Sequence, residues 1–314
     1  MRFTALAGGI GAGKFLRGLV RIVQPEDVTV IVNTGDDVLM HGLHVSPDLD
    51  SVTYWLAGVM DRERGWGRRD ETFRATEELG RFDPGQAWFS LGDLDLATHL
   101  YRTNLLRAGA SLSEATALVV RRFGVGSRIL PMSDDPVATR VSVMAEGKEL
   151  DLHFQEYWVE RRARDEVKAI RYDGVEAARP GADVLESIEA ADLIVICPSN
   201  PIASVRPILS VPGIGKSVAD RRDVAVGVSP IVGGAPLAGM ADRLMPAAGY
   251  AVTALGAAEC YRGLLAGWVV DHADRELAYR IERELGVRVA VTDTVMADDA
   301  KAENVARAAL DLVR

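Results

Sequence analysis

The sequence predicts an α/β protein of the Rossmann-like class, with a mostly parallel sheet flanked by helices. Three observations indicate this fold. The chain opens with a strand, a glycine-rich turn and a helix, it continues with an all-apolar run at 28–32, and strand and helix patterns alternate again after residue 190. All-apolar, β-branched strands are typical of a sheet covered on both faces. We expect one domain over residues 1–314, with a helical insert at about 50–125 and a β-hairpin at about 138–158.

Composition limits the kind of protein and partner. The 314 residues, 48% of them hydrophobic, can build a large core. A net charge of -9 argues against nucleic acid as a partner, because a polyanion would be repelled. Cys197 and Cys260 lack CxxC spacing, so we expect two small core residues in a reducing cytoplasm. No apolar run approaches the roughly twenty residues of a membrane span, which predicts a cytoplasmic protein without membrane contact.

The first element is the stretch GGIGAGK at 8–14, between a short apolar strand and a helical pattern that starts at Lys14. Glycines let backbone N–H groups approach a phosphate, and the helix N-terminus adds a favourable dipole. A P-loop requires Ser or Thr where Phe15 stands, and the dinucleotide fingerprint requires its third glycine one residue after Gly13. We still predict a phosphate-binding turn that includes Gly9 and Gly11. The alternative is a turn that only packs the helix on the strand.

Acidic residues follow the second strand. The run VTVIV at 28–32 leads into NTGDD at 33–37, and SPDLD follows at 46–50. Asp36 lies where a dinucleotide-binding fold places a ribose-binding acid, but here Asp37, Asp48 and Asp50 accompany it. Four carboxylates near strand ends indicate a metal ion or a hydroxyl-bearing ligand. Helix capping for Asp48 and Asp50, and a local turn role for Asp36, are the alternatives.

Helical patterns continue to about residue 124. Ser111 and Glu114 form an S-x-x-E capping box at the head of the last of these helices. Asp93 and Asp95, in SLGDLDLATH, stand at a helix start, where capping would also explain them. The link RERGWGRRD at 62–70 is basic and interrupted by glycines, so we expect a surface loop.

A hairpin comes next. Residues 141–143 and 150–154 alternate between apolar and polar, and Glu146-Gly147 has the composition of the turn between them. The hairpin ends in the aromatic run 153–158, which includes Tyr157 and Trp158. These rings could stack on a flat ligand, and core packing is the alternative.

The second half returns to alternating strands and helices. A buried strand at 193–197 ends at PSNP, and ligands of open α/β sheets bind at such carboxyl ends. Ser199 and Asn200 could therefore recognise a base, unless PSNP is a simple turn. A strand at 224–228 precedes a second glycine turn, and two further strands, in WVVDHAD and VRVAVTDT, precede a C-terminal helix.

The order of these motifs resembles the 2-phospho-L-lactate transferase family of coenzyme F420 biosynthesis. GGIGAGK, NTGDD, SPDLD, SLGDLDLATH, HFQEYWV, PSNP and SPIVGG carry the resemblance across most of the chain. It implies an enzyme with magnesium that takes a guanylylated phospho-acid and the deazaflavin Fo as small-molecule substrates. The phospho-acid would pass to a ribityl hydroxyl of Fo, giving dehydro-F420-0 or F420-0 and GMP. The resemblance also implies a homodimer.

The resemblance also implies roles for single residues. Asp50 would lie at the Fo hydroxyl and act in catalysis with Asp36, while Asp36, Asp37 and Asp50 would hold Mg²⁺. The other predicted ligand-binding residues are Gly9, Gly11, Gly13 and Lys14 at the phosphates, Ser199 and Asn200 at the guanosine, and Asn33, Thr34, Asp93, Tyr157 and Trp158. In one departure, Leu94 stands between the two acids of SLGDLDLA, where we expect many relatives to have a basic residue.

Two functions from other classes stay open at this point. A nicotinamide-dependent oxidoreductase would share the fold, but the misplaced third glycine and the clustered acids disfavour it. A nucleotide-sensing regulatory protein would use the glycine turn without the acids. The sequence also leaves open whether phosphoenolpyruvate, phospholactate or phosphoglycerate is transferred.

Overall fold

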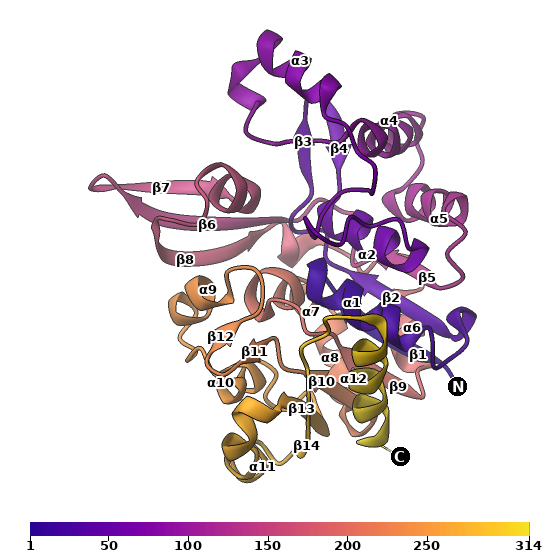
Figure 1. Ribbon diagram of the computed structural model, residues 1–314, viewed down its shortest axis with the longest axis vertical. Coiled ribbons are helices and arrows are strands. Elements are labelled where there is room, and N and C mark those ends of the chain that lie inside the picture. Colours follow the sequence, from indigo (N-terminus) through magenta and orange to yellow (C-terminus); the bar gives the residue numbers. More distant parts are fainter. Residues whose placement is uncertain (314) are drawn as a thin grey trace.

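A seven-stranded sheet forms the centre of the protein in the computed structural model, which describes residues 1–313 (Figure 1). The strand order is β14-β13-β10-β9-β1-β2-β5, and every neighbouring pair is parallel. The predicted Rossmann-like class is therefore confirmed. The strands are β1 (Phe3–Ala7), β2 (Val28–Val32), β5 (Arg128–Pro131), β9 (Leu193–Ile196), β10 (Ala225–Val228), β13 (Gly267–Asp271) and β14 (Arg288–Thr292).

The strand order reverses beside β1. β2 and β5 follow on one side of it, and β9, β10, β13 and β14 follow on the other. The loops that leave β1 and β9 therefore diverge, and they open a crevice at the carboxyl ends of the strands. The glycine turn follows β1 and PSNP follows β9, so the topology brings both predicted motifs to this crevice.

Helices cover both faces of the sheet. Alternate side chains of each buried strand therefore enter two separate hydrophobic cores, one on each face. Ala5 and Val30 belong to the core on one side, whereas Leu6 and Ile31 belong to the core on the other. On the first side lie α1 (Gly9–Leu19), α2 (Pro47–Ala57), α5 (Leu112–Arg122) and α12 (Asp299–Asp311). On the second lie α6 (Val184–Glu189), α7 (Arg206–Ser210), α8 (Ile214–Asp220), α9 (Ala241–Ala247), α10 (Ala254–Glu259) and α11 (Ala278–Leu285).

Helix α1 begins at Gly9, so the prediction that it starts at Lys14 was wrong. The glycines lie inside its first turns, where they permit close packing. A Cβ at Gly11 would lie 2.0 Å from the carbonyl oxygen of Pro198, and one at Gly13 would lie 2.1 Å from the indole of Trp55. The interpretation of these glycines as packing residues is therefore correct for Gly13, which brings α1 against α2.

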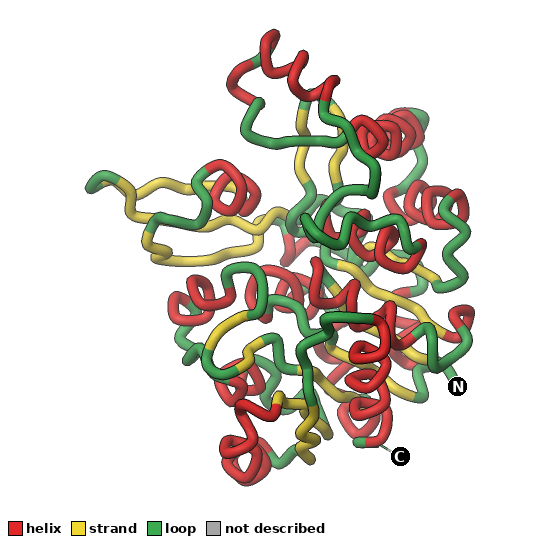
Figure 2. Tube along the Cα trace, in the orientation of Figure 1, coloured by secondary structure: helices red, strands yellow, loops and turns green. Residues whose placement is uncertain are grey.

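Between β2 and β5 the chain forms a hairpin and four helices. The hairpin, β3 (Val38–Met40) and β4 (Leu43–Val45), was not predicted, and it projects from the main body together with α3 (Arg74–Phe82) (Figure 1). Helix α4 (Asp93–Arg107) and α5 complete the segment, and the predicted capping box of Ser111 and Glu114 is present. Figure 2 shows a long loop between α2 and α3.

A second projecting unit is a three-stranded antiparallel sheet of order β7-β6-β8. Strands β6 (Ala138–Ala145) and β7 (Lys148–His153) form the predicted hairpin, and Glu146 and Gly147 both have positive φ in its turn. The third strand, β8 (Glu166–Asp173), was not predicted. Within residues 1–313, no helix combines the length and the apolar composition that crossing a membrane requires.

The remaining elements are short. They are the strands β11 (Ile231–Val232) and β12 (Ala235–Pro236), the 3₁₀ helices Pro25–Asp27, Pro84–Gln86, Val175–Ala177, Arg222–Val224 and His272–Leu277, and the π-helical turns Glu156–Glu160 and Pro201–Val205.

Candidate active site

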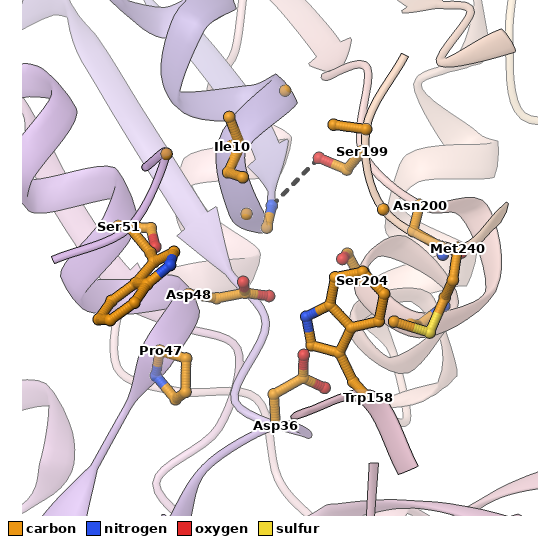
Figure 3. A pocket seen from close by; sticks show the side chains of 18 of the residues that line it. Ile10, Asp36, Pro47, Asp48, Ser51, Trp158, Ser199, Asn200, Ser204 and Met240 are labelled. Carbon is orange, nitrogen blue, oxygen red and sulfur yellow. Dashed lines mark hydrogen bonds between the residues drawn. The ribbon is translucent and has the colours of Figure 1, made fainter. Parts of the chain in front are cut away.

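A cavity of about 950 Å³ lies at the carboxyl ends of the central strands, where the sheet, the insert and the projecting sheet meet (Figure 3). The glycine turn after β1, the segment after β2 and PSNP after β9 all contribute to its wall. The loop between α2 and α3, the start of α4 and the end of the β6–β7 hairpin close it from the other side. Segments far apart in sequence thus share one site.

The glycine turn is tied to PSNP. The backbone N–H of Gly8 donates to Ser199 Oγ at 3.2 Å, and both residues line the cavity (Figure 3). Gly9 has a φ of 70°, a conformation that favours glycine. Lys14 also lines the cavity, and its ammonium group forms no ion pair with any of residues 1–313. The turn therefore presents an unbalanced positive charge beside exposed backbone.

Two buried carboxylates, Asp36 and Asp48, face the cavity opposite this turn (Figure 3). Asp48 Oδ2 accepts a hydrogen bond of 2.9 Å from the Asn33 amide, while Asp36 Oδ1 is buried without a partner among the described residues. Burial raises the pKa of Asp48 to about 7. Burial, and then the charge of Asp48, raises the pKa of Asp36 well above its usual range. We call these two residues the Asp36–Asp48 pair.

Asp37 lies next to this pair but does not line the cavity. Its Oδ2 accepts a hydrogen bond of 2.7 Å from Ser46 Oγ and lies 2.9 Å from His44 Nε2. Oδ2 of Asp37 therefore already has protein partners that hold the chain between β2 and α2 in place, while its Oδ1 is buried without a partner among the described residues.

Asp50 also lines the cavity, but a buried cation balances its charge. Arg102, which is 1% exposed, donates from both terminal nitrogens to the two carboxylate oxygens of Asp50. His99 lies between Asp50 and Asp95, 3.5 Å from the first and 3.4 Å from the second. Tyr54 donates to Asp95 at 2.6 Å. We call these five residues the Asp50 network.

The Asp50 network contains the one cluster of three potential metal ligands among residues 1–313. Ligand atoms of Asp50, Asp95 and His99 lie within 4.8 Å of one another. Because the Arg102 guanidinium already binds both oxygens of Asp50, a divalent cation there would meet a fixed positive charge. The network is better suited to orienting a neutral hydroxyl than to holding a metal.

Asp93 does not line the cavity, contrary to the predicted ligand contact. Its carboxylate accepts hydrogen bonds from Thr72 Oγ1 and from the backbone N–H of Ala75, in the first turn of α3. Asp93 thus binds the start of α3 and does not cap its own helix α4, whose N-cap residue is Gly92. Asp95, two residues later, faces the cavity instead, and the side chain of Leu94 is exposed.

The two predicted aromatic residues are neighbours with opposite environments. Tyr157 is fully buried in the core and does not line the cavity, whereas Trp158 lines it and is 39% exposed. The core alternative thus describes Tyr157, and Trp158 can contact a ligand. Phe154 of the predicted run also lines the cavity, together with three aromatic side chains that were not predicted there, Trp66, Trp88 and Phe89.

The remaining predicted residues divide into lining and supporting positions. Ser199 and Asn200 line the cavity, and Asn200 Oδ1 accepts from the backbone N–H groups of Ile202 and Ala203. Asn33 does not line it, but its amide group holds Asp48. Thr34 is buried beside Asn33 and does not line it either.

Sequence reasoning did not assign roles to His99 and Arg102. Both lie on α4, where Asp95 and His99 are four residues apart and His99 and Arg102 are three apart. Residues at these spacings share one face of a helix. The spacing in the DLATHLYR segment could therefore have predicted that Asp95, His99 and Arg102 lie together. It could not have predicted their contact with Asp50, which is 52 residues away in sequence from Arg102.

Comparison with known proteins identifies the family of the chain. The family model described as 2-phospho-L-lactate transferase CofD matches residues 3–311. A phosphoenolpyruvate transferase of Streptomyces griseus is 48% identical over 313 residues, covering 99% of this chain and 98% of the relative. A 2-phospho-L-lactate transferase of Methanosarcina acetivorans is 41% identical over 301 residues, covering 96% and 95%.

A solved structure supports the fold. A member of the UPF0052 family from Bacillus halodurans superimposes with a TM-score of 0.63 at 18% identity, and the match covers 98% of each chain. The resemblance found in the sequence motifs is confirmed by the family model and by the curated relatives. The chain belongs to the 2-phospho-L-lactate transferase CofD family and is a transferase.

Proposed function

We propose that the protein transfers phosphoenolpyruvate or 2-phospho-L-lactate from a guanosine diphosphate-linked donor to the ribityl hydroxyl of the deazaflavin Fo. The products are dehydro-F420-0 or F420-0 and GMP. One observation carries the proposal: a single cavity combines a glycine turn and an unpaired Lys14 with buried carboxylates and aromatic side chains. Phosphoryl transfer to an alcohol needs the phosphate-binding turn, the cation and the carboxylates, and the aromatic side chains offer contacts for a flat acceptor.

The donor binds along the crevice between β1 and β9. The backbone N–H of Gly11 and the ammonium of Lys14 contact the diphosphate, while the backbone N–H of Gly9 is hydrogen-bonded to Asp48. Ser199 and Asn200 lie at the guanosine end. Gly13 supports this arrangement without touching the ligand, since its missing side chain lets α1 pack against Trp55.

Magnesium fits the Asp36–Asp48 pair. Two buried carboxylates with raised pKa values, one of them with an unpartnered oxygen, form a site that favours a divalent cation with oxygen ligands. Of the three predicted metal ligands, this assignment retains Asp36. It replaces Asp37 and Asp50 by Asp48. When bound, Mg²⁺ supplies charge neutralisation for the phosphate oxygens.

Asp50 orients the acceptor. Arg102 donates to both oxygens of Asp50 and holds its carboxylate in one orientation, so the remaining lone pairs of Asp50 can accept a hydrogen bond from the ribityl hydroxyl. The hydroxyl oxygen then forms a bond to the phosphorus that bears the acid, the bond from that phosphorus to the GMP oxygen breaks, and the hydroxyl proton passes to the carboxylate. Trp158 offers a face for the deazaflavin ring.

The test is to incubate the purified protein with Fo, MgCl₂ and one guanylylated acid at a time. Mass spectrometry should detect dehydro-F420-0 or F420-0, with GMP in equal amount, for one of the phosphoenolpyruvate, phospholactate and phosphoglycerate donors. Absence of product with all three donors, in a folded protein, would contradict the proposal. Tight binding of NADH without turnover would favour the oxidoreductase instead. The homodimer, the exclusion of nucleic acid and the cytoplasmic location stay predictions.

A further inference from the structure

Arg64 lies on the loop between α2 and α3, and its side chain lines the cavity. An antiparallel bridge between Met60 and Arg68 closes this loop. Gly65 has a φ of 77°, and a Cβ added there would lie 3.0 Å from Ile10 Cδ1. The loop therefore packs against the first turn of α1. The segment that the sequence predicts as a surface loop forms part of the cavity wall.

The Arg64 guanidinium has a fixed orientation. Its Nη2 donates to the carbonyl of Arg68 at 2.9 Å and lies 2.9 Å from Asp61 Oδ2. The guanidinium carbon lies 5.3 Å from the ring centroid of Trp66 and 5.0 Å from that of Phe73. Hydrogen bonds and cation–π contacts thus hold the planar group before any ligand binds.

One edge of this guanidinium has no protein partner. Nη1 donates no hydrogen bond to any of residues 1–313, although the side chain is 29% exposed at the cavity wall. Arg64 and Lys14 are the two Lys or Arg side chains that line the cavity within the described chain. A ligand with two separate anionic groups would therefore find the unpaired ammonium of Lys14 for one group and the free Nη1 of Arg64, whose Nη2 is paired with Asp61, for the other.

The start of α1 lies between two walls of the cavity. A Cβ at Gly11 would meet Pro198 of PSNP, whereas Ile10 contacts Gly65 of the Arg64 loop. In Figure 3, Ser199 and Asn200 lie on one side of Ile10, and Ser51 of α2 lies on the other. A diphosphate held at the glycine turn, with guanosine at Ser199, would extend its other end toward the Arg64 loop.

We infer that Arg64 determines specificity by binding the carboxylate of the transferred phospho-acid. The inference rests on the proposed function, because that function supplies a donor with a carboxylate beyond its diphosphate. Lys14 is a compact charge next to the glycine turn and serves the phosphates, whereas Arg64 presents an oriented N–H edge to a planar carboxylate. GDP, which lacks the carboxylate, does not use Arg64.

Calorimetry on Arg64→Gln tests this assignment with two ligands, GDP and guanylylated phosphoenolpyruvate. We expect the variant to bind the guanylylated acid roughly tenfold to a hundredfold more weakly, as the loss of one charged hydrogen bond predicts. GDP affinity should stay within about twofold of wild type. Arg62→Gln is the matched control, because Arg62 lies two residues away, pairs with Asp299 and does not line the cavity.

An analogue of the donor with a carboxamide in place of the carboxylate sharpens the test. Wild type should bind it about as weakly as Arg64→Gln does, and the substitution should not weaken it further. Equal loss of GDP and donor affinity in Arg64→Gln, or no loss of either, would overturn the inference alone. If wild type binds GDP but not the guanylylated acid, the proposed function fails and the inference fails with it.

Discussion

The two acidic groups of the cavity differ in how their charge is balanced. The Asp36–Asp48 pair faces the glycine turn without a cation, and burial raises both pKa values. In the Asp50 network, Arg102 contacts both oxygens of Asp50, and Tyr54 donates to Asp95. Both groups are buried, so burial does not distinguish them. The countercharge distinguishes them: Arg102 balances Asp50, whereas no Lys or Arg side chain among the described residues forms an ion pair with Asp36 or Asp48.

The largest expected effect is a loss of unfolding free energy when the cation of the Asp50 network is removed. Arg102→Leu leaves Asp50 as a buried charge without its partner, which costs about 3–5 kcal/mol of unfolding free energy. Urea denaturation measures this loss. Arg107→Leu, on the exposed end of the same helix, should cost less than about 1 kcal/mol.

A second variant shows whether charge is the cause. Asp50→Asn combined with Arg102→Leu should recover part of the loss, because neither charge is then left unpaired. Equal stability of Arg102→Leu and wild type would mean that Asp50 is not ionised in the folded protein, and the contrast between the two groups would disappear.

The next effect concerns the Asp36–Asp48 pair and magnesium. Asp48→Asn should lower kcat roughly a thousandfold, because a metal that neutralises transition-state charge contributes several kcal/mol. MgCl₂ should raise the Tm of wild type but not of Asp48→Asn. Asp50→Asn serves as the control and should keep the response to MgCl₂.

The same substitution has an opposite effect on stability without metal. The pKa of Asp48 is raised to about 7 in the folded state, so stability falls as the pH rises from the ordinary Asp pKa of about 4 to about 7, and the loss is complete above that pH. At pH 8 without Mg²⁺, Asp48→Asn should therefore be more stable than wild type by on the order of 1–3 kcal/mol. If the rise in Tm with MgCl₂ depends on Asp50 and not on Asp48, the metal binds at the Asp50 network, and its assignment to the Asp36–Asp48 pair is wrong.

The sheet could be predicted because its strands have a local signature. Val28 to Val32 is apolar and β-branched throughout, and β2 has these bounds. The same reasoning missed β5, whose RILP ends in proline, and β8, where charged and apolar residues are mixed. These strands depend on pairing with β2 and β6, which are distant in sequence. Local patterns therefore give the strands whose own residues are continuously apolar or alternate regularly, and not β5 and β8, whose residues do neither.

The site was less predictable, because its electrostatics depend on tertiary contacts. The sequence shows that Asp36, Asp37, Asp48 and Asp50 cluster, but not that His44 and Ser46 bind Asp37 or that Arg102 binds Asp50. Asp48 has a first-turn position in α2, yet Asn33 turns its carboxylate to the site. The function of each acid follows from its partners.

A smaller effect is expected for Asp50→Asn in catalysis. The substitution keeps the shape of the side chain but removes the charge that accepts the hydroxyl proton, so kcat should fall about a hundredfold. Initial rates at saturating Fo, donor and MgCl₂ measure it. A purely structural role for Asp50 would instead leave the rate of the folded variant near that of wild type.

The smallest expected effect is on the KM for Fo, and it tests whether Trp158 contacts the deazaflavin ring. Trp158 lines the cavity (Figure 3), whereas its neighbour Tyr157 is buried in the core. Trp158→Ala should raise the KM for Fo about three- to tenfold, as the loss of one aromatic contact predicts, and leave the KM for the donor unchanged. Tyr157→Phe keeps the ring in the core and should change neither constant. If Trp88→Ala raises the KM for Fo and Trp158→Ala does not, the deazaflavin ring binds at Trp88, and Trp158 only forms part of the cavity wall.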